Sequence, residues 1–440
     1  MHKLFGFSLS DHNRVFAIAL PMIISNIAAP LLGLVDTAII GHLPDAIYLS
    51  AVAVGAMVVS FIYLLAVFLR MATTGYIAQS YGADDIHAQR QHFNNGIIIA
   101  LGLGVLIAVA SPLINDLAMW VIAPSVELEG YARDYIEIRL WSAPASLITL
   151  VALGVLLGRQ NSRKAMLLVI ITNAVNVVMD VILILGFGLN VKGAAWASLS
   201  AEWVTAIVGF YWTARALGWH LRHWQLKFQQ LRQFLGVNGN IFMRSLILQL
   251  CMATMTGYAT RYGSTMVAVN AVLMQFLMLI SLGLDGIAYA VEALAGAAKG
   301  QKRYDKVRYW CKITLLWSSL FAVVYTLVFA LAGSAIIRLI TDIPEIIRVA
   351  EDYLPWIIVL PLLAHWSYWF DGVFIGLSLS RGMRNTMILS AVIGFLPLWW
   401  AGLPLENHGL WLALSGFLFM RGITQAIWFK YLSSPDHPSG

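Results

Sequence analysis

The chain of 440 residues is strongly apolar, with 60% hydrophobic and 11% charged residues and a mean hydropathy of +0.77. Soluble globular domains carry about 25% charged residues. A water-soluble fold is therefore excluded, and we expect an all-α integral membrane protein. The net charge of +6 does not indicate a nucleic-acid partner, because in a membrane protein the positions of the cations matter more than their sum. The two cysteines lie in separate apolar segments and indicate neither a disulfide nor a metal site.

Twelve apolar segments are long enough to cross a membrane, which takes about 20 residues for a helix. In chain order we predict spans at 15–40, 48–78, 95–117, 133–158, 164–186, 194–217, 238–260, 265–297, 312–337, 351–376, 386–403 and 409–430. The second and eighth are long enough to project beyond the bilayer or to tilt strongly.

Twelve spans place both termini on one side of the membrane, and the cations indicate which side. With a cytoplasmic N-terminus, nineteen Lys and Arg residues fall in inner loops and five in outer loops. Positive charge collects on the cytoplasmic side of membrane proteins. We therefore expect a multi-pass protein of the bacterial cytoplasmic (inner) membrane with both termini in the cytoplasm.

The chain resembles two six-span halves offset by about 218 residues. Gly154 and Gly158 at the end of the fourth span match Gly372 and Gly376 at the end of the tenth. Such spacing of small residues permits close helix contact. We predict an N-lobe at 1–218 and a C-lobe at 238–440, as two six-helix bundles related by pseudo-two-fold symmetry, with a substrate cavity between them.

A basic connector is predicted between the halves, at 219–237. It mixes cations with Trp219, Trp224, Leu226 and Phe228. This composition indicates a short amphipathic piece at the membrane surface.

The first span carries Asp36 with no cation near it in sequence. A carboxylate in a membrane favours its neutral form until a cation or water reaches it, as a proton or sodium carrier requires. A static pair with an arginine from another span is the alternative. Pro21 and Pro30 each remove a backbone hydrogen bond, so this helix can bend near Asp36.

The fifth span contains Asn173, Asn176 and Asp180, which are three and four residues apart and lie on one helical face. Asparagine oxygens beside a carboxylate can coordinate sodium or surround a proton-bearing acid. Such a face can instead serve only to bind helices together.

Each of four further acids within or near spans can be either a functional group or a member of a structural ion pair. They are Glu202, Asp285, Glu292 and Asp371. For the intramembrane arginines Arg70, Arg139, Arg244 and Arg421 we expect snorkelling or a carboxylate partner. His365 lies six residues before Asp371, on a different helical face, which argues against a His-Asp relay.

Phosphate-loop, HExxH and GxSxG motifs are missing, and no nucleophile and base pair is found, so we expect no enzyme.

The sequence resembles the multidrug and toxic compound extrusion (MATE) family over its whole length, within it the DinF-like bacterial branch. The resemblance is carried by Pro21 and Val35-Asp36-Thr37 in the first span, by the end of the second span at Ala78–Asp84, and by Asn176 with Asp180 in the fifth. It implies a secondary antiporter that exports organic, cationic or amphipathic drugs or toxic metabolites by rocker-type alternating access.

The resemblance further implies that Asp36 and Asp180 are the acids of an N-lobe cavity and that Pro21 bends the first span. Many relatives carry an asparagine near Ala152 or Leu153, which this chain lacks. We therefore expect coupling to protons, with sodium at Asp36, Asn176 and Asp180 as the alternative, and no other cofactor. A monomer in contact with membrane lipid is expected. A flippase for lipids or lipid-linked substrates remains the alternative function.

Overall fold

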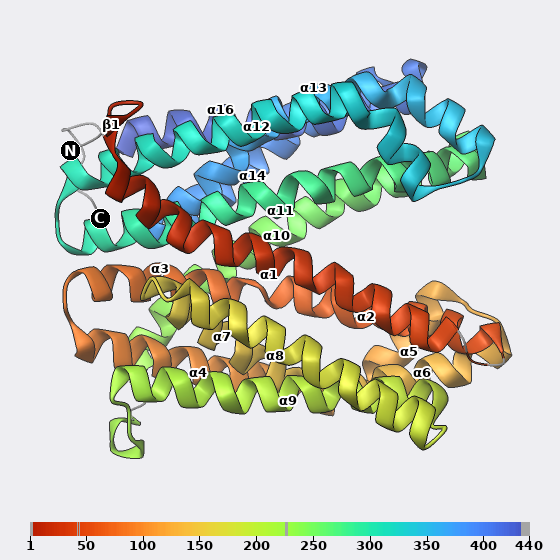
Figure 1. Cartoon of the computed structure of the whole chain (residues 1–440), viewed down its shortest axis with the longest axis horizontal. Helices are drawn as coiled ribbons and strands as arrows, with labels where there is room; N and C mark the ends of the chain where they lie inside the picture. Colours follow the sequence, from red (N-terminus) through yellow and green to blue (C-terminus); the bar gives the residue numbers. More distant parts are fainter. Residues whose placement is uncertain (1–2, 42, 44, 225–227, 433–440) are drawn as a thin grey trace. The chain divides into compact units, whose positions relative to one another are not determined.

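The computed structural model describes residues 3–41, 43, 45–224 and 228–432, and these form helices apart from one short hairpin (Figure 1). The strands β1 (Lys3–Leu4) and β2 (Phe7–Ser8) pair antiparallel ahead of the first helix. Two compact units are formed, one of Leu20–Asn238 and one of Met1–Ala19 with Gly239–Gly440. We call them the N-unit and the C-unit.

The N-unit holds most of α1 and the helices up to the chain midpoint. Their bounds are α1 (Leu9–Gly41), α2 (Ala46–Ala66), α3 (Phe68–Gly82), α4 (Ile86–Val109), α5 (Ser111–Ile122), α6 (Val126–Leu140), α7 (Ala143–Gly158), α8 (Ser162–Asp180), η1 (Val181–Gly186), α9 (Asn190–Leu217) and η2 (Leu221–His223). Side-chain oxygens of Asp45, Asp85 and Asn161 accept hydrogen bonds from the first turns of α2, α4 and α8. These caps satisfy helix-end N–H groups and fix where the helices begin.

The C-unit contains the remaining helices. Their bounds are α10 (Phe228–Ala259), η3 (Thr260–Tyr262), α11 (Ser264–Gly300), α12 (Tyr304–Ile340), α13 (Pro344–Gly376), α14 (Ser380–Ser390), η4 (Ala391–Phe395), α15 (Leu396–Ala401), η5 (Leu403–Leu405) and α16 (Asn407–Leu432). A large apolar core of this unit lies between α11, α12, α13 and α16 and includes Phe276, Phe329, Trp411 and Phe417.

The start of α1 belongs to the C-unit because it packs on α12. Tyr309 donates a hydrogen bond to Asp11 at 2.6 Å, and Trp317 donates to His12 at 2.9 Å. The guanidinium of Arg14 lies over the ring of Trp310. The first 19 residues therefore lie outside the N-unit, although the sequence assigned them to an N-lobe of 1–218.

The twelve predicted spans each coincide with a helix or with a helix broken into segments. Among the described residues, eight helical segments are long and apolar enough to cross a membrane, and α6 with α7 forms a ninth that is bent by 49°. The breaks also divide the second, third, fifth and eleventh predicted spans, at Val67, Ala110, η1 and η4. Hydropathy identifies these spans but does not reveal their breaks, because a kinked segment is as apolar as a straight one.

The helix α10 begins at Phe228, inside the predicted connector of 219–237. Trp219 is buried against Phe93 and Phe210 and donates to Asn94 at 2.6 Å, so it anchors the connector to α4. Trp224 and Phe228 are exposed, as an amphipathic piece requires. Leu226 lies outside the described residues.

The two predicted glycine pairs make the close helix contacts that their spacing indicates. A β-carbon at Gly154 would come within 2.8 Å of the Arg70 carbonyl oxygen on α3. At Gly372 and Gly376 it would overlap the carbonyl oxygens of Ala288 and Glu292 on α11. The same pairing, α7 on α3 and α13 on α11, thus occurs once in each unit and confirms close contact at matching places of the repeat.

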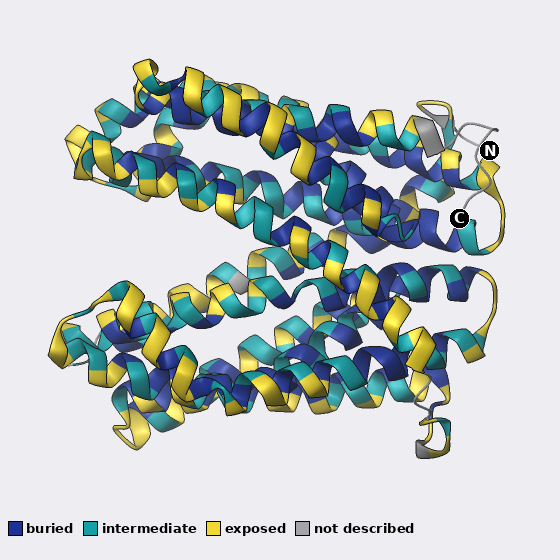
Figure 2. Ribbon diagram, turned by 180° about the vertical axis from the view of Figure 1, so that it is seen from behind, coloured by how far each residue is buried: buried dark blue, intermediate teal, exposed yellow. Residues whose placement is uncertain are grey.

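Exposed residues occur along the lengths of the helices and not only at their ends (Figure 2). Many of them are large apolar residues. Val109, Leu113 and Leu331 are 67%, 71% and 88% exposed. Soluble proteins rarely expose apolar patches of this extent. The surface is therefore suited to contact with lipid chains.

Candidate functional site

The predicted acids of the first and fifth spans meet in the N-unit. With each amide donor facing an acceptor, Nδ2 of Asn176 donates to Asp36 at 2.9 Å and to Asp180 at 3.2 Å. Its Oδ1 accepts from the backbone N–H and the hydroxyl of Ser198 on α9, at 3.2 and 3.0 Å. The spacing on α8 therefore does place Asn176 and Asp180 on one face, and that face meets Asp36 of α1.

The carboxyl groups of Asp36 and Asp180 accept from the same amide nitrogen and lie close enough for a hydrogen bond between them. An ionised carboxylate only accepts hydrogen bonds, so one of the two groups must carry a proton for this bond to form. Two acids in one small site resist ionising together because their like charges repel. Such a pair can chemically hold one proton between two helices.

The helical segments around this pair are irregular. Pro21 and Pro30 lie inside α1, and the π-helical turn η1 begins directly after Asp180. Asn173 donates to the carbonyl oxygen of Ala28 at 2.9 Å and so ties α8 to α1 between the two prolines. π-helical turns inside helices are frequent at functional sites, and a proline-containing helix can bend.

A second polar group in the N-unit surrounds Glu202, which the sequence left open between function and pairing. Glu202 forms an ion pair with Arg139 at 2.9 Å and accepts a short hydrogen bond from Ser146. The hydroxyl groups of Tyr63 and Ser142 are hydrogen-bonded at 3.0 Å and complete the group. Arg139 also acts electrostatically on Asp36. For Arg139 the sequence left snorkelling or a carboxylate partner open, and the structure shows the second, with Glu202 as the acid.

A cavity of about 430 Å³ lies beside this group. Most of its lining is apolar, and the residues around it are Glu202, the hydroxyl-bearing Ser60, Tyr63, Ser146, Thr149, Thr172 and Thr205, and the aliphatic Leu64, Val67 and Leu150. Its volume lies within the range of small-molecule sites, roughly 300–1,000 Å³. Thr172 lies one helical turn before Asn176, so the cavity reaches the helix face that carries the paired acids.

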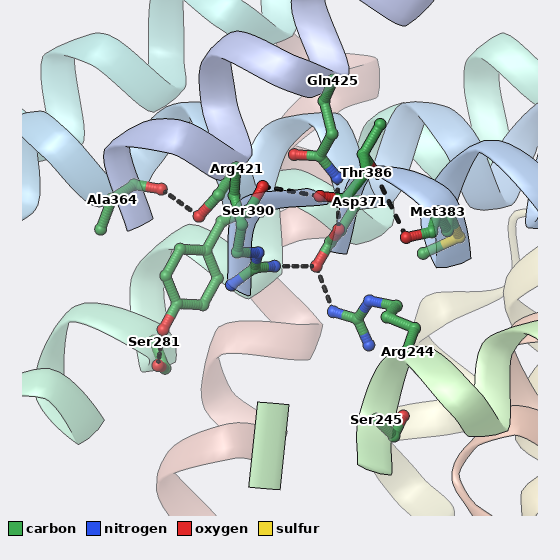
Figure 3. Close-up of polar contacts among 12 residues, drawn as sticks. Arg244, Ser245, Ser281, Ala364, Asp371, Met383, Thr386, Ser390, Arg421 and Gln425 are labelled. Atoms are coloured by element: carbon green, nitrogen blue, oxygen red, sulfur yellow. Dashed lines mark hydrogen bonds and ion pairs between the residues drawn. The ribbon is translucent and has the colours of Figure 1, made fainter. Parts of the chain in front are cut away.

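In the C-unit, Asp371 of α13 is buried among partners from α10 and α16 (Figure 3). Its Oδ2 accepts from Arg244 and, at 2.7 Å, from Arg421, and its Oδ1 accepts from Gln425 at 2.9 Å. The expectation of carboxylate partners for both arginines is confirmed. His365 contacts Leu362 and Ser319, in agreement with its predicted separation from Asp371.

The two other acids of the C-unit lie on α11. Glu292 is buried near the contact with Gly376, and Asp285 acts electrostatically on Tyr325 and Tyr368. Asp285 and Asp371 both act electrostatically on Tyr368, whereas the hydrogen-bond partners of Asp371 come from α10 and α16. Among the described residues, no group of three His, Cys, Asp or Glu side chains is arranged to hold a metal ion.

Comparison with known proteins relates the chain to transporters. The MatE family model matches residues 21–182 and 241–400. The chain is 42% identical to DNA damage-inducible protein F of Escherichia coli over 97% of its length and 94% of that protein. It is 25% identical to the probable multidrug resistance protein NorM of Thermotoga maritima, over 94% of its own length and 91% of that protein.

Solved structures show the same fold. A MOP superfamily transporter from Pyrococcus furiosus aligns with a TM-score of 0.85 and 22% identity over 95% of each chain. An outward-facing MATE family transporter aligns with the same TM-score at 23% identity. The all-α fold is thus the twelve-helix, two-bundle architecture of these transporters. The chain is therefore a multi-pass membrane transporter of small molecules, not an enzyme, and it belongs to the MATE family in its DinF-like branch.

Proposed function

We propose that the chain exports organic compounds across the bacterial inner membrane in exchange for protons. The proposal rests on one observation, the hydrogen-bonded group of Asp36, Asn176 and Asp180 between α1 and α8. This group can hold one proton and can release it only with a change in its own contacts. The family assignment gives small-molecule transport, and the acid pair supplies the ion coupling.

The structure supports a physical route from protonation to movement. With one proton, the two carboxyl groups share a hydrogen bond that holds α1 to α8. Without it, two like charges face each other in a site of low polarity, and their repulsion favours separation of the helices. Pro21 and Pro30 let α1 bend in response. The hydrogen bond from Asn173 to the carbonyl oxygen of Ala28 is kept in one state of the bend and broken in the other. Rocker-type alternating access follows when this bend changes the side of the membrane to which the transport pathway is open.

Exchange requires that proton and substrate favour different states, because a ligand shifts a conformational equilibrium only through differential affinity. The cavity beside Glu202 reaches α8 through Thr172 and is our candidate for substrate contact in the N-unit. A cationic or amphipathic compound that enters it would meet Glu202 and would alter the field that Arg139 exerts on Asp36.

Protons are favoured over sodium because many family relatives carry an asparagine near Ala152 or Leu153 and this chain lacks it. The amide of Asn176 can serve either ion, since its nitrogen donates to the two acids in one orientation and its oxygen would face them in the other.

The location and orientation follow from the cations of the loops. Nineteen inner against five outer cations favour a cytoplasmic N-terminus and C-terminus. In the C-unit, the start of α1 and the end of α16 lie at the same end of the bundle (Figure 1), as an even number of spans requires. The flippase alternative gains no support from relatives whose names describe multidrug resistance and export.

The test is dye transport by proteoliposomes with a proton gradient and a sodium gradient imposed separately. We expect a cationic rhodamine ester to be moved against its gradient by the proton gradient alone. Asp36→Asn should abolish this coupled movement while the protein remains folded, and Asp342→Asn, an exposed matched acid in the C-unit, should transport like the wild type. Full coupled transport by Asp36→Asn would remove Asp36 from the mechanism, and transport driven only by sodium would refute proton coupling.

A further inference from the structure

The ion-pair cluster of the C-unit contains more positive than negative charge. It consists of Arg244, Asp371, Arg421 and Gln425, all at most 8% exposed (Figure 3). Two guanidinium groups meet one carboxylate, and the electrostatic neighbours of Arg421 are Asp371, the second arginine and Tyr368. Asp371 has the two arginines as electrostatic neighbours, and it also acts on Tyr368, as does Asp285 of α11. The two guanidinium groups and the one carboxylate that they share therefore carry one net positive charge.

The geometry leaves hydrogen-bonding capacity unused. Both arginines donate to the same oxygen of Asp371, each through one nitrogen, although a guanidinium and a carboxylate frequently pair through two parallel bonds. Within the part of the chain that the structure describes, the Nε atoms of both arginines are buried without a hydrogen-bond partner, and so is Oε1 of Gln425. Buried polar atoms are normally satisfied, so such a group calls for an explanation.

A purely structural role does not account for the second arginine. One arginine and one aspartate already form a neutral pair, and an additional charge inside a membrane bundle is costly. Ionisable groups retained there often mark substrate or ion pathways. The unpaired donors are those that a group with two negatively charged oxygens would fill.

We infer that the Arg244–Asp371–Arg421 cluster binds the anionic group of a transported organic compound, as a carboxylate, sulfonate or phosphate. This inference rests on the proposed transport function and specifies its substrates further. The N-unit then offers Glu202 to positively charged compounds, and the C-unit offers two arginines to negatively charged ones. Asp371 occupies the arginines when no ligand is present and competes with the incoming anion.

The test compares two dyes with the same xanthene core, sulforhodamine B, which carries sulfonates, and a cationic rhodamine ester. Their binding to the purified full-length transporter in neutral detergent is followed by fluorescence anisotropy. We expect Arg421→Gln and Arg244→Gln each to weaken sulforhodamine B binding about tenfold or more and to leave the cationic dye unchanged. Arg338→Gln, a matched arginine whose side chain is 67% exposed in the same unit, should bind both dyes like the wild type.

Removal of the competing acid provides a change in the opposite direction. Asp371→Asn should tighten sulforhodamine B binding, whereas loss of a merely structural pair would not. Folding of each variant is verified by its retained affinity for the cationic dye and by size-exclusion chromatography. Wild type that does not bind sulforhodamine B, or folded Arg421→Gln and Arg244→Gln that bind it within twofold of wild type, would overturn the inference.

A lipid headgroup could supply the same anionic chemistry. Sulforhodamine B binding is therefore repeated in nanodiscs of phosphatidylcholine with and without phosphatidylglycerol. Binding that is equal in both supports a transported compound, and displacement by phosphatidylglycerol assigns the cluster to lipid and overturns the substrate assignment. Because binding is measured without a gradient, failure here is distinguishable from failure of proton-coupled efflux of the cationic dye.

Discussion

Breaking the Arg139–Glu202 ion pair should destabilise the protein strongly, whereas removing both charges together should not. The two side chains are 11% and 17% exposed, and their nitrogen and oxygen lie 2.9 Å apart. Removal of one partner from a buried pair leaves an uncompensated charge and costs about 3–5 kcal/mol. Replacement of both partners by neutral groups is often nearly neutral, because no charge is then left out of water.

The change is therefore tested as a double-mutant cycle of Arg139→Gln, Glu202→Gln and the combined variant. Glutamine keeps much of each side chain's length and can hydrogen-bond across the former pair. We expect each single variant to lose about 3–5 kcal/mol, reduced by whatever water reaches the site, and the double variant to lose less than either. The coupling should then exceed the roughly 0.5–3 kcal/mol that is usual for contacting residues.

Thermal unfolding of the purified variants in detergent measures the stability, and dye efflux measures function. Ser146→Ala serves as a milder comparison, because it removes one neutral donor to Glu202 and leaves the ion pair intact. Additive losses in the double variant would refute the reasoning, since they would show that the two charges do not stabilise each other. Unchanged efflux in a folded Arg139→Gln would separate Arg139 from the coupling acid Asp36.

Two further predictions follow from helix contacts. Gly372→Ala should lower the stability of the protein by about 1–3 kcal/mol, because a β-carbon there overlaps the Ala288 carbonyl. Gly257→Ala is the control and should not lower it, because no atom lies within 4 Å of a β-carbon at that position. An unfolding temperature at or above wild type for Gly372→Ala would contradict this prediction. Asn173→Ala should slow efflux roughly two- to tenfold through the loss of one hydrogen bond of about 0.5–1.5 kcal/mol that ties α8 to α1. Proteoliposome transport measures this change, with Ser200→Ala, which bonds only within its own helix, as control, and equal rates for both variants would refute it.

The sequence alone determined the features that depend on composition and local spacing. Long apolar stretches of the sequence indicated the twelve predicted spans, each of which coincides with a helix or a broken helix, because a membrane helix needs about 20 mostly apolar residues. The spacing of Asn176 and Asp180 placed them on one face because helical geometry is regular over one turn. The glycines at 154, 158, 372 and 376 revealed close helix contacts because a side chain there has no space beside the neighbouring backbone.

Only the tertiary structure decided which residues from distant helices meet. The sequence could not show that Glu202 pairs with Arg139, or that Arg244 and Arg421 share Asp371, because such partners are separated by 50 to 127 residues and no local pattern links them. It also missed the helix breaks after Asp180 and at Ala391–Phe395 and the packing of the start of α1 on α12. These features are set by which helices pack against one another, and that choice depends on the shapes of all of them at once.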